Sequence, residues 1–280
     1  MDQTVKGDRI TETYWSVTEY ADASVKRATK VKTRDQKKYF LDLPDYEASV
    51  SMLRMGWPEE LPAALEIAES AVATANREHM MDTFNPVWDV TGAEVDVARY
   101  LSGEPECMID FPLTKTSKSG RVVTMVAPIC FSSWVDTDSV LRRGHVIVAL
   151  ALALSQLGHA CEIWADINLD GHVEAYQRVC LKGASDELDP GTLMFALAHA
   201  AMLRRVAFGT FDGFPPKWRE PFSDNANRGS VGRRSREDIA LFPEGTIFLP
   251  ELTDESDDYA NADVFLREHL GNLGLLADAE

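Results

Sequence analysis

The stretch from Val146 to Leu154 is the most apolar run of the chain and places the strongest constraint on its fold. Its nine consecutive apolar residues fall short of the roughly 18 to 20 needed to cross a bilayer. Asp136 stands where a helix N-cap is expected, and Gly158 stands where a C-cap is expected. These signals predict a helix from Ser139 to Leu157 whose apolar run is buried at the centre of a domain.

Strand and helix patterns surround this predicted central helix. Met108–Leu113 and Arg121–Phe131 are expected to pair as a hairpin, because a polar loop separates two strand-like runs. The other expected strands are Ile10–Val17, His159–Ala165, Val173–Leu181, Ile239–Phe242 and Thr246–Leu249, and the other expected helices are Trp57–Arg77, Ala93–Leu101 and Gly191–Arg205. No internal repeat is visible, so the pattern predicts a single mixed-sheet domain of the α+β class.

Charge divides the chain into three expected parts. Residues 1–45 form a basic arm or edge hairpin, residues 46–250 form the mixed α/β core domain, and residues 251–280 form an acidic tail. The tail has a charge balance of −8 and carries a short amphipathic helix built on Val264, Phe265, Leu266, Leu270 and Leu273. Such a patch can dock on the body or on a partner. If the acids compete with an anionic ligand for the basic residues, removal of the tail would raise affinity at low salt.

Two stretches are basic although the whole chain has a formal net charge of −17. Residues 26–38 have a balance of +6 and precede two aromatic residues, and residues 217–236 have a balance of +4. Cations that follow phosphates and rings that stack on unpaired bases are what a single-stranded nucleic acid requires. The expected binding residues are Lys26, Arg27, Lys30, Lys32, Arg34, Lys37, Lys38, Tyr39, Phe40, Lys217, Trp218, Arg219, Phe222, Arg228, Arg233, Arg234 and Arg236.

The alternative is that these residues have no such role, because charge runs are usually solvated surfaces and aromatic clusters usually belong to the core. Trp218 helps to distinguish the two interpretations. It follows Pro215 and Pro216, a context that predicts extended backbone and an exposed ring.

Two further segments leave alternatives open. Asp166, Asn168, Asp170, Gly171 and Glu174 match a calcium loop, but Gln177 replaces its bidentate glutamate, and a hairpin turn explains the same residues. Near the start of the central helix, two arginines could hold a phosphate or form salt bridges with nearby aspartates. The residues concerned are Arg142, Arg143, Asp136 and Asp138.

Enzyme motifs are missing from the sequence. There is no nucleophile elbow, phosphate-binding loop, dinucleotide fingerprint or zinc-protease motif, and the four cysteines and six histidines lack metal-ligand spacing. We therefore expect no catalysis, no metal and no cofactor; an enzyme of unfamiliar type would draw on Asp110, Asp136 or Asp166. The N-terminus lacks a secretory signal pattern, so a cytoplasmic location is expected, in the host cell if the protein is viral.

A family resemblance rests on the residues around the central helix. Arg142-Arg143-Gly144, the apolar helix, Gly158-His159 and the strand Cys161–Trp164 follow in that order, with Gly103–Met108 upstream. This order resembles tailed-phage proteins and is distantly similar to the single-stranded-DNA-binding RNA polymerase cofactor of N4-like bacteriophages. The strand, helix, strand unit also looks like a von Willebrand A-type domain, whose metal motif is replaced here by Cys130-Phe-Ser132-Ser133.

The phage resemblance implies binding of unpaired DNA without sequence readout, recruitment of a phage RNA polymerase or replication protein, and no enzymatic step. Membrane binding is not expected, and the oligomeric state stays open. The alternative is a phage interaction or assembly protein without a nucleic-acid role, whose basic stretches bind acidic partners.

Overall fold

The computed structural model describes most of the chain. The described residues are 1–28, 43–78, 80–84, 87–110, 113–117, 120–131, 135–169, 171–222, 239, 241–253 and 258–276, and the side chains of residues 76–87, 113–117 and 222 lie outside this description. Of the described helices, none is long and apolar enough to pass through a membrane.

A mixed six-stranded sheet forms the centre of the fold, with the strand order β1-β2-β10-β9-β8-β11. Strands β8, β9 and β11 are parallel, β9 and β10 form an antiparallel hairpin, and β10 is parallel to β2. The strands span Asp2–Lys6 (β1), Arg9–Tyr14 (β2), Val122–Pro128 (β8), Ala160–Leu169 (β9), Glu174–Lys182 (β10) and Ile247–Phe248 (β11). This arrangement confirms the predicted α+β class and mixed sheet.

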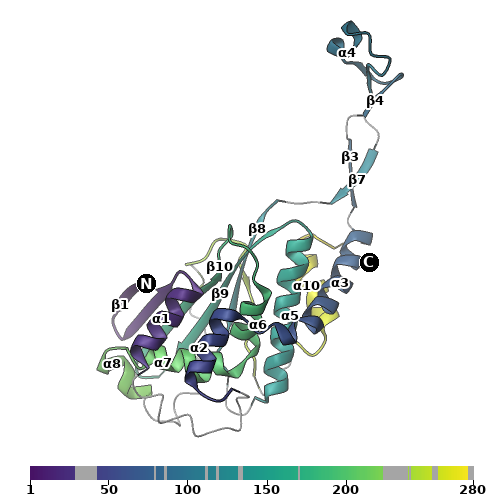
Figure 1. The fold of residues 1–280 in the computed structure, drawn as a ribbon. Helices are drawn as coiled ribbons and strands as arrows, with labels where there is room; N and C mark the ends of the chain where they lie inside the picture. Colours follow the sequence, from purple (N-terminus) through teal and green to yellow (C-terminus); the bar gives the residue numbers. More distant parts are fainter. Residues whose placement is uncertain are drawn as a thin grey trace.

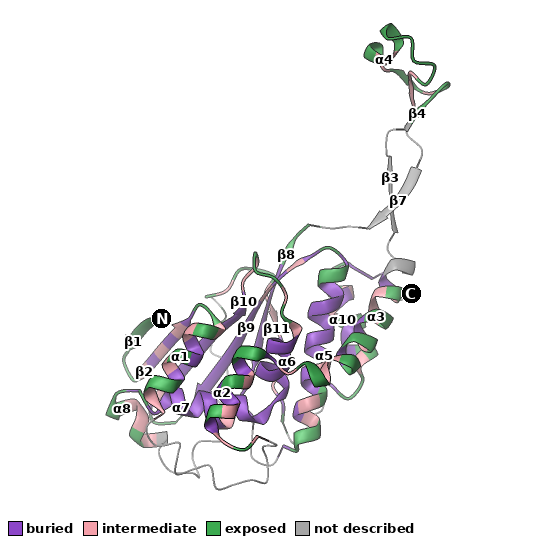
Figure 2. Ribbon diagram, viewed as in Figure 1, coloured by how far each residue is buried: buried purple, intermediate pink, exposed green. Residues whose placement is uncertain are grey.

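Helix α5 (Thr137–Gln156) is the predicted central helix. Asp136 caps it by accepting a hydrogen bond from the Ser139 backbone N–H at 2.7 Å, and this bond lowers the pKa of the Asp136 carboxyl. Twelve residues of helix α5 are buried, and Figure 2 shows most of this helix in the colour of buried residues. The helix connects the parallel strands β8 and β9, so the predicted strand, helix, strand unit is present.

The helices pack in a row across the sheet, in the order α1, α2, α6, α5 and α3, and α10 contacts both α3 and α5 (Figure 1). Their bounds are Val17–Arg27 (α1), Tyr46–Met55 (α2), Leu61–Glu78 (α3), Pro190–Ala198 (α6) and Ala262–Asn272 (α10), with the short helices η2 (Pro58–Glu60), η3 (Met202–Ala207), α7 (Phe208–Phe211), α8 (Pro216–Arg219) and η4 (Glu220–Phe222). The expected helix Gly191–Arg205 is interrupted at His199, whose extended backbone separates α6 from η3.

Between α3 and β8 the chain leaves the body and forms a projecting arm (Figure 1). Strands β3 (Met80–Phe84) and β7 (Leu113–Ser117) pair along it. At its end, β4 (Val87–Asp89), β5 (Glu94–Val95) and β6 (Met108–Asp110) form a three-stranded sheet beside helix α4 (Val97–Leu101). The expected hairpin of Met108–Leu113 with Arg121–Phe131 is therefore wrong, because β6 and β7 pair within the arm.

Two other expected elements differ from the structure. Leu241 and Phe242 lie in a turn, so the strand expected at Ile239–Phe242 is not formed in its described part. Within Ala93–Leu101 only Val97–Leu101 is helical, because Glu94 and Val95 pair with β6.

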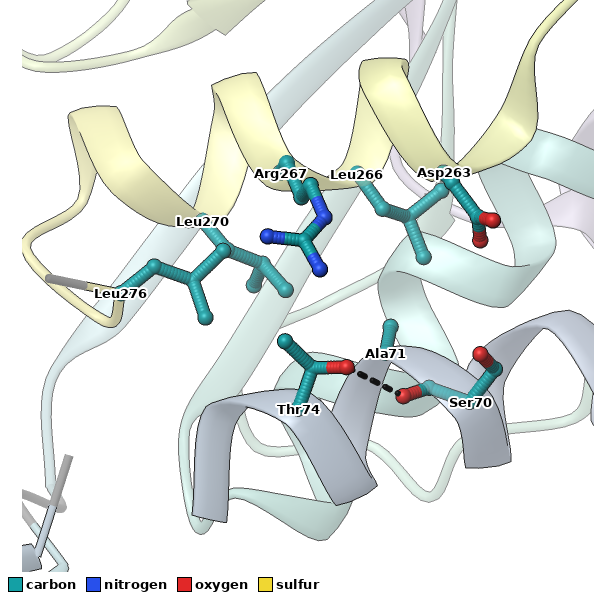
Figure 3. Close-up of a pocket in the computed structure, with 8 residues that line it drawn as sticks. All are labelled: Ser70, Ala71, Thr74, Asp263, Leu266, Arg267, Leu270 and Leu276. Atoms are coloured by element: carbon teal, nitrogen blue, oxygen red, sulfur yellow. Dashed lines mark hydrogen bonds between the residues drawn. The ribbon is translucent and has the colours of Figure 1, made fainter. Parts of the chain in front are cut away.

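The C-terminal helix α10 is part of the body. Leu266 and Leu270 point toward α3 and, with Ala71 and Thr74, line a cavity of about 50 Å³ between the two helices (Figure 3). Phe265, Leu266 and Leu270 are at most 4% exposed and belong to the main core. Helix α10 therefore packs on the body, which is one of the two placements expected for its apolar patch.

Gly144 allows α5 and α6 to approach closely, because a Cβ at this position would overlap the Cβ of Ala198. We expect Gly144→Ala to lower the free energy of unfolding by about 1–3 kcal/mol through overpacking. Gly271→Ala is the matched control: Gly271 lies in α10, and no atom lies within 4 Å of the point where a Cβ would stand, so helix propensity predicts a gain of up to ~1 kcal/mol. Urea unfolding measures both variants, and an equal gain for the two would contradict the close packing.

Candidate nucleic-acid interface

Five of the expected binding residues have described side chains: Lys26, Arg27, Lys217, Trp218 and Arg219. The first two end helix α1, and the other three form α8 with Pro216. The remaining residues lie outside the described side chains; these are Lys30, Lys32, Arg34, Lys37, Lys38, Tyr39, Phe40, Phe222, Arg228, Arg233, Arg234 and Arg236.

The fold brings the end of α1 close to the segment that leads into α8. Helices α1 and α7 pack together, and a Cβ at Gly209 would lie 3.2 Å from the Cβ of Ala28. A Cβ at Gly213 would overlap the side chain of Arg27. Residues about 190 positions apart in the chain thus share one corner of the body. We call Lys26, Lys217 and Arg219 the basic corner.

Arg27 is engaged inside the fold. Its Nη1 donates to Glu12 Oε2 at 2.6 Å and to the Tyr14 hydroxyl at 3.0 Å, while Glu12 is fully buried. Tyr14 also donates to Glu12, and burial together with the Glu12 charge raises the pKa of the Tyr14 hydroxyl. Because a buried carboxylate needs a cation and hydrogen bonds, Arg27 neutralises Glu12 and fastens α1 to β2.

Lys217 and Trp218 hold α8 against the turn between β1 and β2. Lys217 Nζ lies 2.8 Å from Asp8 Oδ1 and 4.8 Å from the centre of the Trp218 ring. The hydrogen bond and charge of Lys217 lower the pKa of the Asp8 carboxyl. Trp218 Nε1 donates to the Asp8 carbonyl oxygen at 3.0 Å.

The expectation of extended backbone and an exposed ring at Trp218 is wrong. Pro216 occupies the first turn of a short helix, where proline is well tolerated, and the ring is half-buried against the core. Lys26 is exposed, and none of the residues that the structure describes forms an ion pair with it. Arg219 is half-buried.

Both basic stretches start at this corner. Residues 26–38, with their balance of +6, begin in the last turn of α1, and residues 217–236, with their balance of +4, begin in α8. Chain connectivity therefore attaches two positively charged stretches to neighbouring points of a body that is acidic overall. The two basic stretches are far apart in the sequence, so their proximity could not be predicted from it. The packing of α1 on α7 shows this proximity.

Comparison with known proteins places the whole fold in one family. The family profile described as "Domain of unknown function (DUF7192)" matches residues 2–277, which include the arm and helix α10. The chain belongs to the DUF7192 family. Neither a curated protein nor a solved structure matches it.

The calcium-loop pattern of the DUF7192 chain falls on a β-hairpin. Asp166 and Asn168 lie within strand β9, and Glu174 begins β10, where it lies 3.9 Å from Arg9 Nε. The pairing of Leu169 with Ala175 confirms the hairpin interpretation. Asp170 lies outside the described residues, and elsewhere in the described chain no group of His, Cys, Asp and Glu is arranged to hold a metal ion.

The paired arginines of the central helix separate in space. Arg142 is exposed, whereas Arg143 is fully buried and its Nη2 donates to the Pro128 carbonyl oxygen. The Arg143 guanidinium lies 5.8 Å from the centre of the Tyr259 ring, and its Nε and Nη1 have no hydrogen-bond partner among the described residues. Arg143 therefore contributes a hydrogen bond inside the fold and does not extend from the helix start into solvent.

The buried cysteines are poor nucleophiles. Burial raises the pKa of the Cys130 thiol to about 12, and it raises the pKa values of Cys161 and Cys180 to about 11. These thiols stay protonated at neutral pH, and the thiolate is the reactive form. All four cysteines are free, and Cys107 is the half-buried one.

The carboxylates considered for catalysis are not brought together. Asp110 lies on the arm, Asp136 caps α5 at the surface, and Asp166 is buried in β9. A recess of about 300 Å³ beside Lys26 is lined also by Glu19 and Asp22 on the same helix face. Asp110, Asp136 and Asp166 thus lie in three different parts of the fold and do not form one site.

Proposed function

We propose that this DUF7192 protein binds single-stranded nucleic acid, and DNA in particular, through the basic corner and the two basic stretches that begin there. Binding does not depend on the nucleotide sequence. The protein acts as a transcription or replication cofactor of a bacteriophage, and its partner is a phage RNA polymerase or replication protein. The observation that supports this proposal is the convergence of the +6 and +4 stretches on one corner.

The physical basis is phosphate neutralisation by cations that the fold holds together. Lys26 is exposed in a recess that Glu19 and Asp22 also line, and Lys217 forms an ion pair with Asp8. The rest of the chain carries excess acid, which repels a polyanion from other surfaces and directs it toward the corner. Tyr39 and Phe40 would supply stacking rings next to the first stretch.

Binding to oligothymidine at two salt concentrations tests the proposal. If about five phosphates are contacted, the logarithmic salt slope is about −3.5, so raising salt from about 50 mM to about 200 mM weakens binding roughly 100-fold. Gel shifts on single-stranded DNA, duplex DNA and RNA of equal length establish the preferred polymer. Absence of binding to oligothymidine at the lower salt concentration would refute the proposal.

A second candidate function, protein interaction without nucleic acid, is favoured by the projecting arm. Its tip, residues 87–110, has a charge balance of −5 and exposes large apolar side chains.

Sequence patterns did not predict this arm, because the strands that build it are separated by about thirty residues. The sequence signal that could have predicted the arm is the recurrence of valine at positions 87, 90, 95 and 97 among acidic residues.

A further inference from the structure

The tip of the arm exposes apolar side chains that would normally be buried. Val97, Tyr100 and Leu101 are 63, 64 and 79% exposed, and their spacing in α4 places them on one face of the helical turn. Val90 and Val95 are 60 and 48% exposed in the same small sheet region. Contiguous exposed apolar surface of this kind marks an interaction site.

Side-chain contacts within the tip fix the conformation of α4 and of the strands beside it. Trp88 Nε1 donates to Asp96 Oδ2 at 3.0 Å, and the Arg99 guanidinium lies 4.8 Å from the centre of the Trp88 ring. Asp96 also caps α4 by accepting from the backbone N–H groups of Ala98 and Arg99. These contacts hold Val97, Tyr100 and Leu101 facing outward.

Charge indicates what covers this face. The tip has six acidic residues, and Arg99, its one base, is already stacked on Trp88. Each tip has a charge balance of −5, so two tips that face each other repel, and contact between them is disfavoured. The charges of this chain that are complementary to the tip are those of the basic corner, and next to Lys26 the apolar side chain of Val25 is 53% exposed.

The arm tip lies far from the basic corner of its own chain. Figure 1 shows α4 and α8 at opposite ends of the molecule, with the sheet and the row of helices between them. A contact between tip and corner therefore joins two copies. Because it uses different surfaces on each copy, it is heterologous and continues from one copy to the next.

We propose that the arm tip of one copy docks on the basic corner of a second copy, producing head-to-tail assembly. This inference goes beyond nucleic-acid binding and needs only the positive charge of the corner. Acidic tips and nucleic acid would then compete for one surface, so oligothymidine disperses the assembly if the proposed function also holds.

Sedimentation velocity on the full chain and on two variants tests the docking. We expect the wild type to self-associate at about 50 mM salt and to dissociate at about 200 mM, because screening weakens the charge contact. The tip variant Tyr100→Ser/Leu101→Ser and the corner variant Lys26→Glu/Lys217→Glu should each lose association by roughly tenfold or more. Val264→Ser, at a position 58% exposed on α10, is the matched control and should associate like the wild type.

Mixing the two variants gives the decisive result. The tip variant retains an intact corner and the corner variant retains an intact tip, so the mixture should form dimers that grow no further. Association of the corner variant alone would establish contact between tips instead, and a monomeric wild type at low salt would overturn the proposal. Circular dichroism checks folding, and Val97→Ser repeats the test at a third position of the same face without changing the charge.

Oligonucleotide binding separates this inference from the proposed function. The tip variant should bind oligothymidine at least as tightly as the wild type, because the tip contributes nothing to the basic corner. Loss of self-association with retained nucleic-acid binding supports both proposals. If the wild type self-associates but does not bind oligothymidine, the result supports head-to-tail docking and contradicts the proposed nucleic-acid binding.

Discussion

Removal of residues 251–280 is expected to abolish cooperative folding of the body rather than to free the basic corner. The segment contributes seven buried apolar side chains: Leu252, Tyr259, Phe265, Leu266, Leu270, Leu275 and Leu276. At ~1.5–3 kcal/mol for each buried side chain, their loss amounts to roughly 10 kcal/mol or more. This equals or exceeds the total stability of a typical domain, which is about 5–15 kcal/mol.

Point variants on α10 make this prediction quantitative. Leu266→Ala should lower the free energy of unfolding by about 2–5 kcal/mol, since Leu266 is 1% exposed against α3. Val264→Ala on the same helix should change it by less than ~0.5 kcal/mol, because Val264 faces solvent. Urea unfolding followed by circular dichroism measures both. A truncated chain that unfolds cooperatively and binds oligothymidine more tightly would restore the competing-tail hypothesis.

Charge reversal at the basic corner is expected to reduce oligothymidine affinity by roughly 100-fold at about 50 mM salt. If the proposed function holds, Lys26→Glu/Lys217→Glu replaces two phosphate contacts by repulsion. The logarithmic salt slope should also become shallower by about 1.4, which is ~0.7 for each lost contact. Fluorescence anisotropy over a salt series measures both quantities.

The matched control changes the net charge by the same amount elsewhere. Arg121→Glu/Arg267→Glu alters the residue that precedes β8 and one residue on α10, away from α8 (Figure 1). This control should retain affinity within a few-fold. Equal losses for the two double variants would show that net charge alone, and not the corner, controls binding.

Local patterns predicted the elements whose stability comes from their own sequence. The central helix and strands β8, β9 and β10 follow from long apolar runs with clear caps, because a run that is apolar on all sides has no alternative to burial. The hairpin at Asp166 also followed from turn residues. These signals fix the strand, helix, strand unit without knowledge of the remaining chain.

Contacts between distant segments were not predictable from the sequence. Arg27 was assigned to nucleic acid because its partner Glu12 lies on another element, where a buried carboxylate looks like an ordinary strand residue. The amphipathic helix α10 was recognised, but the face of α3 that covers it consists of small residues such as Ala71. The arm was missed because β3 and β7 pair across an intervening subdomain.

Photo-crosslinking of a single oligothymidine strand to the full chain, followed by peptide mapping, tests the central claim most directly. We predict cross-links both in the stretch that begins at α1, with Tyr39 and Phe40, and in the stretch that begins at α8, with Trp218. Both cross-links should disappear in Lys26→Glu/Lys217→Glu. Cross-links confined to the arm tip, or to one basic stretch with the other untouched, would contradict a shared binding surface.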